Sequence, residues 1–310
     1  MTPLLRPSAL RPGDRVAVIA ASGPPNQRKL EDGLTALVKA GFEPVVLDSA
    51  RAGGTEYDYL AGDDALRARD FTDALADPAY AAVFCACGGY GAQRTLELVD
   101  WSRIDPTRPK ALVGYSDVTA LLEAVAVKLG WVSLFGPMPA CDGFHEGQGH
   151  YSFDLLMTLL TDPASVRELT FPDARTIAPG VAEGITLGGT ATLLAASLGT
   201  DTSLPAKGAI LFLEDVDEEL FRLDRIVTQL RRSTYSDGVA AVLLGTFTEC
   251  GDPREVERLM TERFGDLGVP VMSGADIGHN IAMQTYPIGV RARLDTEAGT
   301  LSFLDPVLRP

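Results

Sequence analysis

The segment KALVGYSDVTALLEAVAVKLG, residues 110–130, joins a short apolar run to a longer stretch with apolar residues at helical spacing. The run predicts a buried strand ending at Gly114, and the longer stretch predicts a helix that begins near Asp117. Ser116 falls on the sharp turn between them. Because a strand passing directly into a helix is the repeating unit of α/β proteins, this segment decides the fold class.

The same alternation precedes this segment along the first part of the chain. Three earlier runs, DRVAVIAASGP, FEPVVLD and AAVFCAC, predict strands, and LEDGLTALVKAG, DDALRARDFTDALAD and AQRTLELVD predict the helices between them. Such alternation implies parallel pairing, right-handed crossovers and helices on both faces of the sheet. We therefore expect a flavodoxin- or Rossmann-like domain whose ligands bind beyond the carboxyl ends of the strands.

The second part of the chain predicts its own sheet. GAILFLED, GVAAVLLGTF and PVMSGAD read as strands, with LFRLDRIVTQLRRS and REVERLMTERFG as helices, and IGVRARLDTEAGTLSFL as a β-hairpin. Between the two parts, TDPASVRELTFPDARTIAPG is proline-containing and has little periodicity, which favours a linker. We expect an N-terminal nucleophile domain over 1–140, a connecting segment over 141–180, and a mixed α/β domain over 181–310, with the active site between the domains.

Composition limits the possible partners. The 310 residues are 46% hydrophobic and 22% charged, as in ordinary globular proteins, and the formal net charge is −15. A chain this acidic, without a basic stripe, is expected to repel nucleic acid and anionic membrane surfaces.

The expected location is the cytoplasm. The first twenty residues mix charges with prolines, unlike a signal peptide, and no apolar run approaches the roughly 18–20 residues that cross a bilayer. We interpret the four cysteines as small buried residues in a reducing compartment; they are Cys85, Cys87, Cys141 and Cys250.

Ser116 has the position of a nucleophile. A strand-to-helix turn pushes its hydroxyl out of the packed layer, and the following Asp117 amide, at a helix N-terminus, attracts negative charge. A serine whose substrate develops an oxyanion needs both features. The sequence Gly-Tyr-Ser-Asp-Val departs from the Gly-x-Ser-x-Gly elbow at Val118. The alternative is that Ser116 or Asp117 merely caps the helix.

Two other predicted strands end in groups that would activate a serine. AILFLED ends in Glu214 and Asp215, and PVMSGAD is followed by His279. A serine needs a base, and the base needs a carboxylate to orient it and stabilise the imidazolium. Each group taken singly is more often solvated or structural. Together with Ser116 they predict a cleft between the two domains.

A second oxyanion donor is available after the third predicted strand. CACGGYGAQR places Gly88, Gly89 and Gly91 there, and glycines let a backbone N–H approach a ligand closely. The alternative is a glycine turn that only connects the strand to the next helix.

These residues resemble a known family. GGYGAQRTLELVDW, PKALVGYSDVTALL, LFGPM, LFLEDVDEELFRLDRIVTQLR and the GH that precedes YPIGVRARLD occur in the order found in the LD-carboxypeptidases. These serine peptidases include muramoyltetrapeptide carboxypeptidases and microcin-immunity peptidases. The resemblance extends over almost the whole chain.

The resemblance implies a Ser116–Glu214–His279 triad and an oxyanion hole formed by the backbone amides of Gly89 and Asp117. Gly88, Tyr90 and Tyr115, which adjoin these motifs, are expected to contact the substrate.

It also implies hydrolysis of an amide between an L-centre and a terminal D-residue, as in release of D-alanine from murein tetrapeptides during cell-wall recycling. Cleavage of aminoacyl-nucleotide amides, as by the immunity peptidases, is the alternative. The family needs no metal and no organic cofactor, acts on small muropeptide-like substrates, and is commonly homodimeric.

Three positions depart from the family pattern. Relatives often carry Gly directly after the histidine and Asn four residues beyond it, where this chain has Asn280 and Met283. A second-domain GGN appears here as a pair of glycines followed by Thr190. We expect these changes to alter the substrate pocket and to leave the triad intact.

Three other functions compete with this interpretation. CDGFHEGQGH offers metal ligands, but His-Glu-x-x-x-His is one residue longer than the zincin spacing, and its glycines disfavour a helix. GGYGAQ follows a strand without forming the Gly-x-Gly-x-x-Gly pattern of dinucleotide sites. A non-catalytic protein with two lobes would use the same cleft for binding alone.

Overall fold

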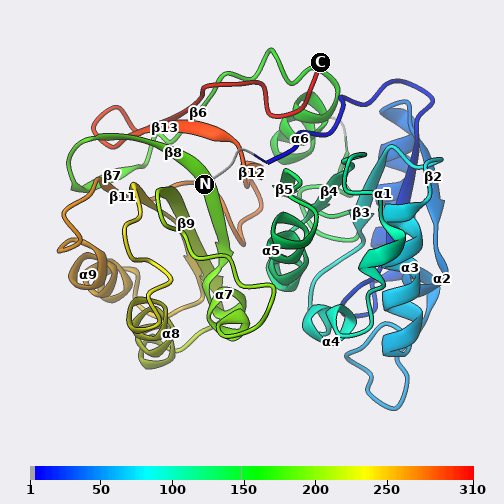
Figure 1. The fold of residues 1–310 in the computed structure, drawn as a ribbon, viewed down its shortest axis with the longest axis horizontal. Helices are drawn as coiled ribbons and strands as arrows, with labels where there is room; N and C mark the ends of the chain where they lie inside the picture. The colour runs from blue at the N-terminus through cyan, green and yellow to red at the C-terminus, as the bar shows by residue number, and fades with distance from the viewer. Residues whose placement is uncertain (1–3, 148) are drawn as a thin grey trace.

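The computed structural model describes residues 4–147 and 149–310, which form two α/β parts lying side by side (Figure 1). Each part is built on its own sheet, and helix α5, Thr119–Lys128, lies at the junction between them. The predicted two-domain α/β architecture is confirmed.

The first sheet is parallel except at one edge. Its strand order is β12-β5-β4-β3-β1-β2, and every neighbouring pair but β12 and β5 runs parallel. The strands are β1 Arg15–Ile19, β2 Glu43–Val46, β3 Ala82–Cys85, β4 Ala111–Gly114, β5 Ser133–Phe135 and β12 Tyr286–Ile288. Parallel strands joined through helices agree with the alternation of the sequence.

Helices connect the parallel strands, and local signals start two of them. Asn26 accepts a hydrogen bond from the Lys29 amide at the start of α1, and Asp63 accepts one from the Leu66 amide at the start of α3. The helical segments here are α1 Gln27–Lys39, α2 Asp48–Arg51, α3 Asp64–Ala76, α4 Ala92–Leu96, the 3-10 turns η1 Trp101–Arg103 and η2 Ser116–Val118, and α6 Tyr151–Thr161.

The second sheet is mixed. Its order is β6-β14-β13-β8-β9-β10-β11-β7, with a parallel centre from β8 to β11 and antiparallel strands on both sides. The strands are β6 Glu168–Thr170, β7 Arg175–Ala178, β8 Val181–Thr190, β9 Ala209–Val216, β10 Ala241–Thr248, β11 Val271–Ser273, β13 Arg291–Asp295 and β14 Thr300–Phe303. β13 and β14 confirm the predicted hairpin.

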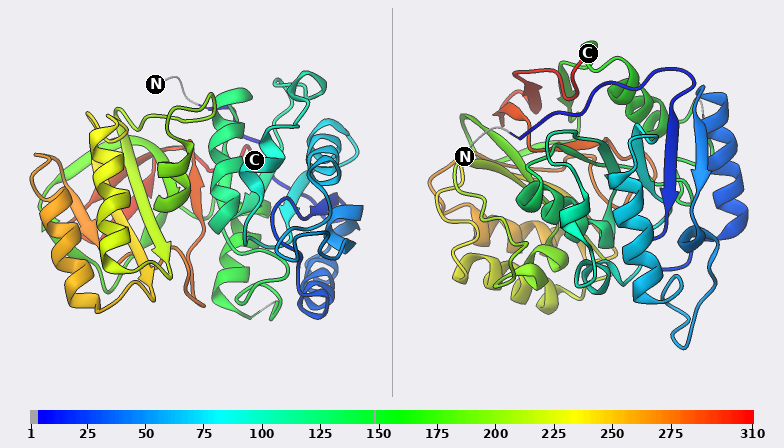
Figure 2. Two further views of the ribbon diagram at one scale, coloured as in Figure 1. Left: turned by 90° about the horizontal axis from the view of Figure 1, so that it is seen from below. Right: turned by 45° about the vertical axis from the view of Figure 1, so that its right-hand side comes forward.

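Three helices follow one another along this sheet: α7 Ala191–Ser197, α8 Leu220–Arg232 and α9 Pro253–Phe264. Figure 2 places α8 and α9 at one end of the molecule and α1 and α3 at the other. Within the described ranges, no helix is both long and apolar enough to cross a membrane.

Two features of the fold go beyond the sequence prediction. β12 comes late in the chain and yet completes the edge of the first sheet, where it pairs with β5. Tyr286 of β12 also donates to the Ile210 carbonyl of the second sheet at 3.1 Å, so this strand ties the two parts together. The expected linker contains β6 and β7, which form the two edges of the second sheet. The boundaries at residues 140 and 180 stay a prediction.

The cysteines only partly follow expectation. All four are free thiols, but only Cys85 and Cys250 are buried, whereas Cys87 and Cys141 are partly exposed. The prediction of four buried residues is wrong for Cys87 and Cys141. β3 ends at Cys85, which leaves Cys87 in the following loop, and Cys141 lies in the loop between β5 and α6. Burial raises the pKa of Cys141 and of Cys250 to about 11, so both thiols stay protonated at neutral pH.

A buried carboxyl joins the two parts. Glu123 of α5 is 6% exposed, and its Oε1 accepts hydrogen bonds from the Leu204 amide at 2.8 Å and the Tyr235 hydroxyl at 3.3 Å. Burial raises the pKa of Glu123 from 4.5 to about 7. Between these values the folded chain holds a proton that the unfolded chain has released, so the free energy of unfolding falls as the pH rises through this window.

We expect Glu123→Gln to remove this pH dependence, which amounts to at most about 3 kcal/mol. The amide cannot ionise, and its oxygen can keep the hydrogen bonds that Oε1 accepts. Urea unfolding at pH 5 and at pH 8 measures the change in both proteins. If the free energy of unfolding differs between pH 5 and pH 8 by the same amount in the variant as in the parent, Glu123 does not titrate in this range.

Candidate active site

The first element of the site is the turn between β4 and α5. Ser116 opens the 3-10 turn η2 with a φ of 63°, a left-handed conformation that a non-glycine residue adopts at a cost of about 1–3 kcal/mol. Gly114 has no room for a side chain, since an added Cβ would lie 2.6 Å from Val118 Cγ1. The turn is therefore as tight and strained as a nucleophile elbow requires.

The capping alternative finds no support at this turn. In the described part of the chain, no side chain caps η2 or α5, and Ser116 Oγ makes no hydrogen bond. The carboxylate of Asp117 instead accepts the Ala92 amide of α4 at 2.8 Å. Burial raises the pKa of this carboxyl above its usual range. Asp117 thus fastens the glycine loop after β3 to the elbow after β4.

That glycine loop lies directly against the serine. A Cβ on Gly88 would fall 2.9 Å from Ser116 Cβ, 3.1 Å from its Oγ and 3.5 Å from the Asp117 nitrogen. The next residue, Gly89, has a φ of 105°, which favours glycine. The Gly88–Gly89 backbone therefore lies directly beside the serine side chain, and its role as an oxyanion donor stays a prediction.

We expect Gly88→Ala to lower kcat/KM about 10²-fold, because the methyl group displaces the serine from its reacting position. Gly88 does not have a positive φ, so alanine adds no left-handed backbone strain there and the clash is confined to the serine. Gly53→Ala is the matched control, since an added Cβ meets nothing within 4 Å at that position. Melting temperatures and steady-state rates are compared for both. A fully active Gly88→Ala enzyme would contradict the placement of this loop.

The second element is a carboxylate–imidazole pair on the second sheet. Glu214, on β9, is fully buried, and its Oε2 lies 2.7 Å from His279 Nδ1 and 3.2 Å from the His279 backbone nitrogen. With Nδ1 directed at the carboxyl group, Nε2 is the ring nitrogen left free to act as a base. The Thr248 hydroxyl donates to the His279 carbonyl at 2.6 Å and fixes this loop further.

Glu214 and its neighbour Asp215 have different roles. Asp215 accepts the amide and hydroxyl of Thr192 at 2.9 and 2.7 Å, at the beginning of α7. Burial raises the pKa of Asp215 to about 6. Because side chains alternate along a strand, adjacent acidic residues point to opposite faces, and only Glu214 meets the histidine.

The two elements meet at the junction of the sheets. The Tyr115 ring, one residue before the serine, lies 5.0 Å from the His279 ring between centroids. Burial raises the pKa of the Tyr115 hydroxyl, so this ring stays neutral beside the imidazole. No hydrogen bond joins Ser116 Oγ to His279 within residues 4–147 and 149–310. Such contacts are often long until substrate binds.

Thr190 bridges the two elements, which the sequence did not predict. Its hydroxyl donates to Glu214 Oε1 and lies 3.4 Å from the Ser116 carbonyl, and its amide donates to Thr119 Oγ1 at 3.2 Å. The departure from the family pattern at Thr190 therefore still supplies a donor to the carboxylate. The two partners lie 24 residues apart, on β8 and β9, and no sequence signal points to this contact.

The other two residues that depart from the family pattern, Met283 and Asn280, differ in how deeply they are buried. Met283 is 2% exposed and packs in the core. Asn280 is partly exposed, and its side-chain nitrogen is buried without a partner in the described part of the chain. A buried amide nitrogen without a partner is costly, so Asn280 is suited to donate to a bound substrate group.

The segment CDGFHEGQGH was expected not to bind metal. Asp142, His145 and Glu146 offer ligand atoms within 4.8 Å of one another in the described part of the chain. The ammonium of Lys29 already lies 2.6 Å from Asp142 Oδ1 and its positive charge opposes a cation there. Gln148 of this segment is outside the described residues. The absence of a functional metal remains a prediction.

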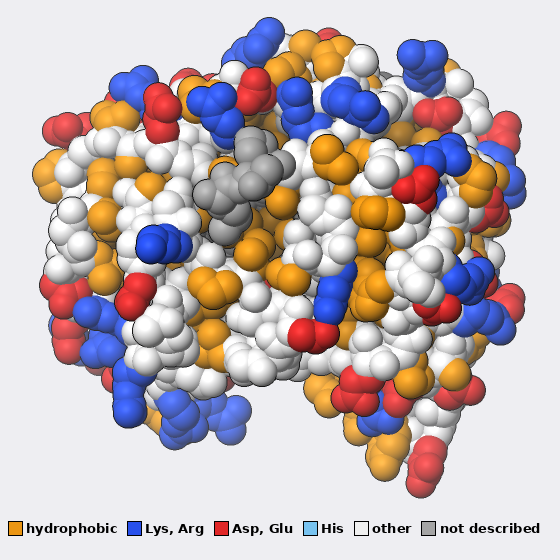
Figure 3. Space-filling view, in the orientation of Figure 1, with side chains coloured by type: hydrophobic (Ala, Val, Ile, Leu, Met, Phe, Trp, Pro, Cys, Tyr) orange, Lys and Arg blue, Asp and Glu red, His pale blue; other side chains and the backbone are white. Residues whose placement is uncertain are grey.

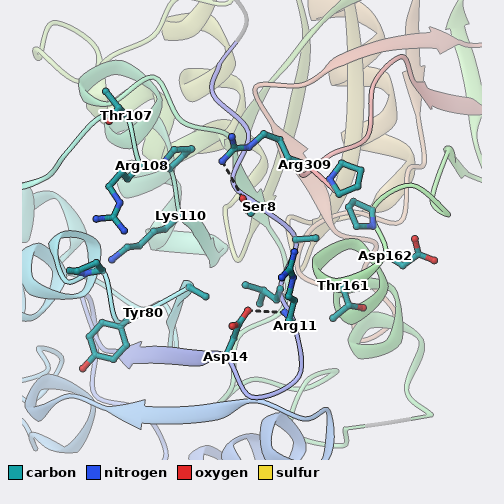
Figure 4. A pocket seen from close by; sticks show the side chains of 17 residues that line it. Ser8, Arg11, Asp14, Tyr80, Thr107, Arg108, Lys110, Thr161, Asp162 and Arg309 are labelled. Carbon is teal, nitrogen blue, oxygen red and sulfur yellow. Dashed lines mark hydrogen bonds between the residues drawn. The ribbon is translucent and has the colours of Figure 1, made fainter.

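A separate cavity of about 670 Å³ lies by the first sheet, at the opposite ends of the strands from Ser116 (Figure 4). Lys110, Asp14 and Ala81, which line it, directly precede β4, β1 and β3, so the cavity lies at the amino ends of these strands. Ligands of parallel sheets bind at the carboxyl ends, where Ser116 and Gly89 lie. The cavity in Figure 4 is therefore not the candidate active site.

Comparison with known proteins identifies the class of the chain. Residues 16–136 match the LD-carboxypeptidase N-terminal domain, and residues 183–294 match the LD-carboxypeptidase C-terminal domain. A putative carboxypeptidase of Streptomyces coelicolor is 45% identical over 99% of both chains. A murein tetrapeptide carboxypeptidase of Pseudomonas aeruginosa is 32% identical, covering 77% of this chain and 80% of its own.

A solved structure agrees. The muramoyltetrapeptide carboxypeptidase from Oxalobacter formigenes has a TM-score of 0.82 and 27% identity, covering 96% of this chain and all of its own. Fold, site and relatives together define a serine peptidase of the carboxypeptidase class. The chain belongs to the LD-carboxypeptidase family.

Proposed function

We propose that this enzyme hydrolyses the amide between an L-centre and a terminal D-residue, releasing D-alanine from a murein tetrapeptide during cell-wall recycling. Ser116 is the nucleophile, His279 the general base and Glu214 the orienting carboxylate. The hydrogen-bonded Glu214–His279 pair, facing a strained serine elbow on the other sheet, carries this proposal. The names of the murein-cleaving relatives support the substrate.

The reaction follows from the roles of these groups. Nε2 of His279 removes the proton of Ser116 as Oγ attacks the scissile carbonyl, while Glu214 stabilises the imidazolium. The amides of Gly89 and Asp117 receive the oxyanion, and one such donor typically contributes about 10²–10³ in rate. The imidazolium then protonates the leaving amine, and water activated by the same histidine clears the acyl-enzyme.

The test is a panel of defined substrates with products read by mass spectrometry. It contains a tetrapeptide ending in D-alanine, the same peptide ending in L-alanine, and an aminoacyl sulfamoyl adenylate. We expect D-alanine release from the first substrate alone, with the rate unchanged in excess chelator. Cleavage confined to the adenylate would support the microcin-immunity alternative, loss of activity in chelator would support a metal enzyme, and no cleavage would support a binding protein.

Further expectations belong to this proposal. The substrate contacts are Gly88, Tyr90 and Tyr115, and the boundaries of the two domains lie near residues 140 and 180. The enzyme is a cytoplasmic homodimer that binds neither nucleic acid nor membranes and uses no cofactor. Four free thiols and the net charge of −15 support the location and the excluded partners, and the family resemblance supports the dimer.

A further inference from the structure

Three neighbouring tyrosines are exposed beside the candidate active site. Tyr57, Tyr59 and Tyr90, the tyrosine row, are 45%, 47% and 51% exposed. The rings of Tyr57 and Tyr59 are stacked with centroids 5.4 Å apart, and those of Tyr59 and Tyr90 meet edge to face at 5.7 Å. Three large rings held together in solvent at the edge of a site are typical of a ligand surface.

The row starts at the proposed oxyanion hole and leads away from it. Tyr90 directly follows Gly89, in the loop after β3, while Tyr57 and Tyr59 lie in the loop between α2 and α3, which follows β2. Gly23, after β1, connects these loops: its amide donates to the Gly88 carbonyl at 3.0 Å, and a Cβ on it would lie 3.3 Å from the Tyr59 carbonyl.

The sheet order sets the reach of the row. Ser116 follows β4, and the order β4-β3-β1-β2 puts three strand spacings between its loop and the loop of Tyr57. At about 4.8 Å a spacing, the loop of Tyr57 is offset from the serine by about 14 Å across the sheet. This loop projects from the lower right of the molecule in Figure 1.

Contacts within the protein hold the rings in place. The Arg94 guanidinium lies over the Tyr57 ring, 5.9 Å from its centroid, and is itself held by both oxygens of Asp64. This hydrogen bonding lowers the pKa of Asp64, so the pair stays ionised and its charges compensate each other. The row therefore offers ring faces and phenolic hydroxyls rather than a free cation.

We propose that the tyrosine row binds the saccharide of a muropeptide, an inference that rests on the function proposed above. Three peptide residues on the acyl side of the scissile bond extend about 10 Å. A muramoyl group acylates the amine end of that peptide and so reaches Tyr59 and Tyr57. A sugar ring has an apolar face and a rim of hydroxyls, which match the ring faces and the phenolic hydroxyls.

The local charge favours a sugar over a nucleotide. The same loop carries Glu56, Asp58 and Asp63, which form no ion pair within the described ranges. Figure 3 shows hydrophobic and acidic side chains on this projection, with basic side-chain atoms between them. A phosphate or sulfamate beside them would be repelled, whereas a neutral saccharide is not.

The test uses Tyr57→Ala and Tyr59→Ala, singly and together, with a muramoyl-tetrapeptide and the free tetrapeptide of the same sequence. We expect the double variant to lose about tenfold in kcat/KM for the muramoyl substrate, through KM, and to keep the wild-type value for the free peptide. Tyr57→Phe keeps the ring and should lose little, and Val38→Ala is an exposed control on α1, outside this loop. Equal losses for both substrates, or none, would overturn the proposal.

A binding measurement tests the saccharide site independently of the proposed reaction. Calorimetry with Ser116→Ala compares the Kd of the two substrates without turnover. We expect the muramoyl group to tighten binding about tenfold with the row intact and not at all without it. Equal affinities, or a row that strengthens binding of an aminoacyl sulfamoyl adenylate instead, would overturn the saccharide site. If the wild-type enzyme releases no D-alanine, the proposed reaction is wrong, and the affinities still decide whether the saccharide site exists.

Discussion

Replacing Ser116 with alanine is expected to lower kcat on a murein tetrapeptide by about 10⁴–10⁶-fold and to leave substrate binding nearly unchanged. The hydroxyl is the attacking group, and no other side chain at the elbow replaces it. Alanine keeps the left-handed backbone of residue 116, so the unfolding transition should stay close to that of the parent.

Release of D-alanine, measured by mass spectrometry, and thermal unfolding together test this variant. Ser102→Ala is a suitable control because that serine is exposed on η1 and hydrogen-bonds only within its own turn. Rates above a hundredth of the parent's in Ser116→Ala would assign the nucleophile to another residue.

Replacing Glu214 with glutamine is expected to lower kcat about 10²–10⁴-fold. The amide has the shape of the carboxylate but no charge to stabilise the imidazolium, and its nitrogen would face the N–H of His279. The buried pocket around Thr190 keeps a group of the same size, so the variant should fold.

Asp215→Asn is the matched control for this prediction, because it makes the same change one residue along β9, where the side chain contacts Thr192 and not the histidine. It should alter stability more than kcat. A folded Glu214→Gln enzyme with the kcat of the parent would exclude the carboxylate from the reaction.

Much of this arrangement could be predicted because strand ends are visible in sequence. Apolar runs followed by polar residues predict β4, β9 and β11. Within each sheet, the carboxyl ends of parallel strands lie on the same side. That reasoning placed Ser116 on a turn and singled out Glu214 and His279, which the structure brings into hydrogen-bond contact. Their catalytic roles stay predictions.

The features that escaped prediction depend on contacts between distant segments. β12 has three residues and pairs across the domain boundary, so its local sequence does not specify its partner. β6 and β7 are edge strands of three and four residues with prolines between and beside them, so they are too short to show a strand period. Thr190, at the end of β8, and the tyrosine row, in two loops of the first sheet, acquire their neighbours only when segments far apart in the sequence come together.

The most direct test of the central claim is the location and rate of labelling by a serine-directed fluorophosphonate. We predict that tandem mass spectrometry finds the adduct on Ser116, and that His279→Ala, a change in the other domain, slows its formation by several orders of magnitude. Labelling of a different residue, or an undiminished rate in a folded His279→Ala protein, would contradict a nucleophile and base shared between the two sheets.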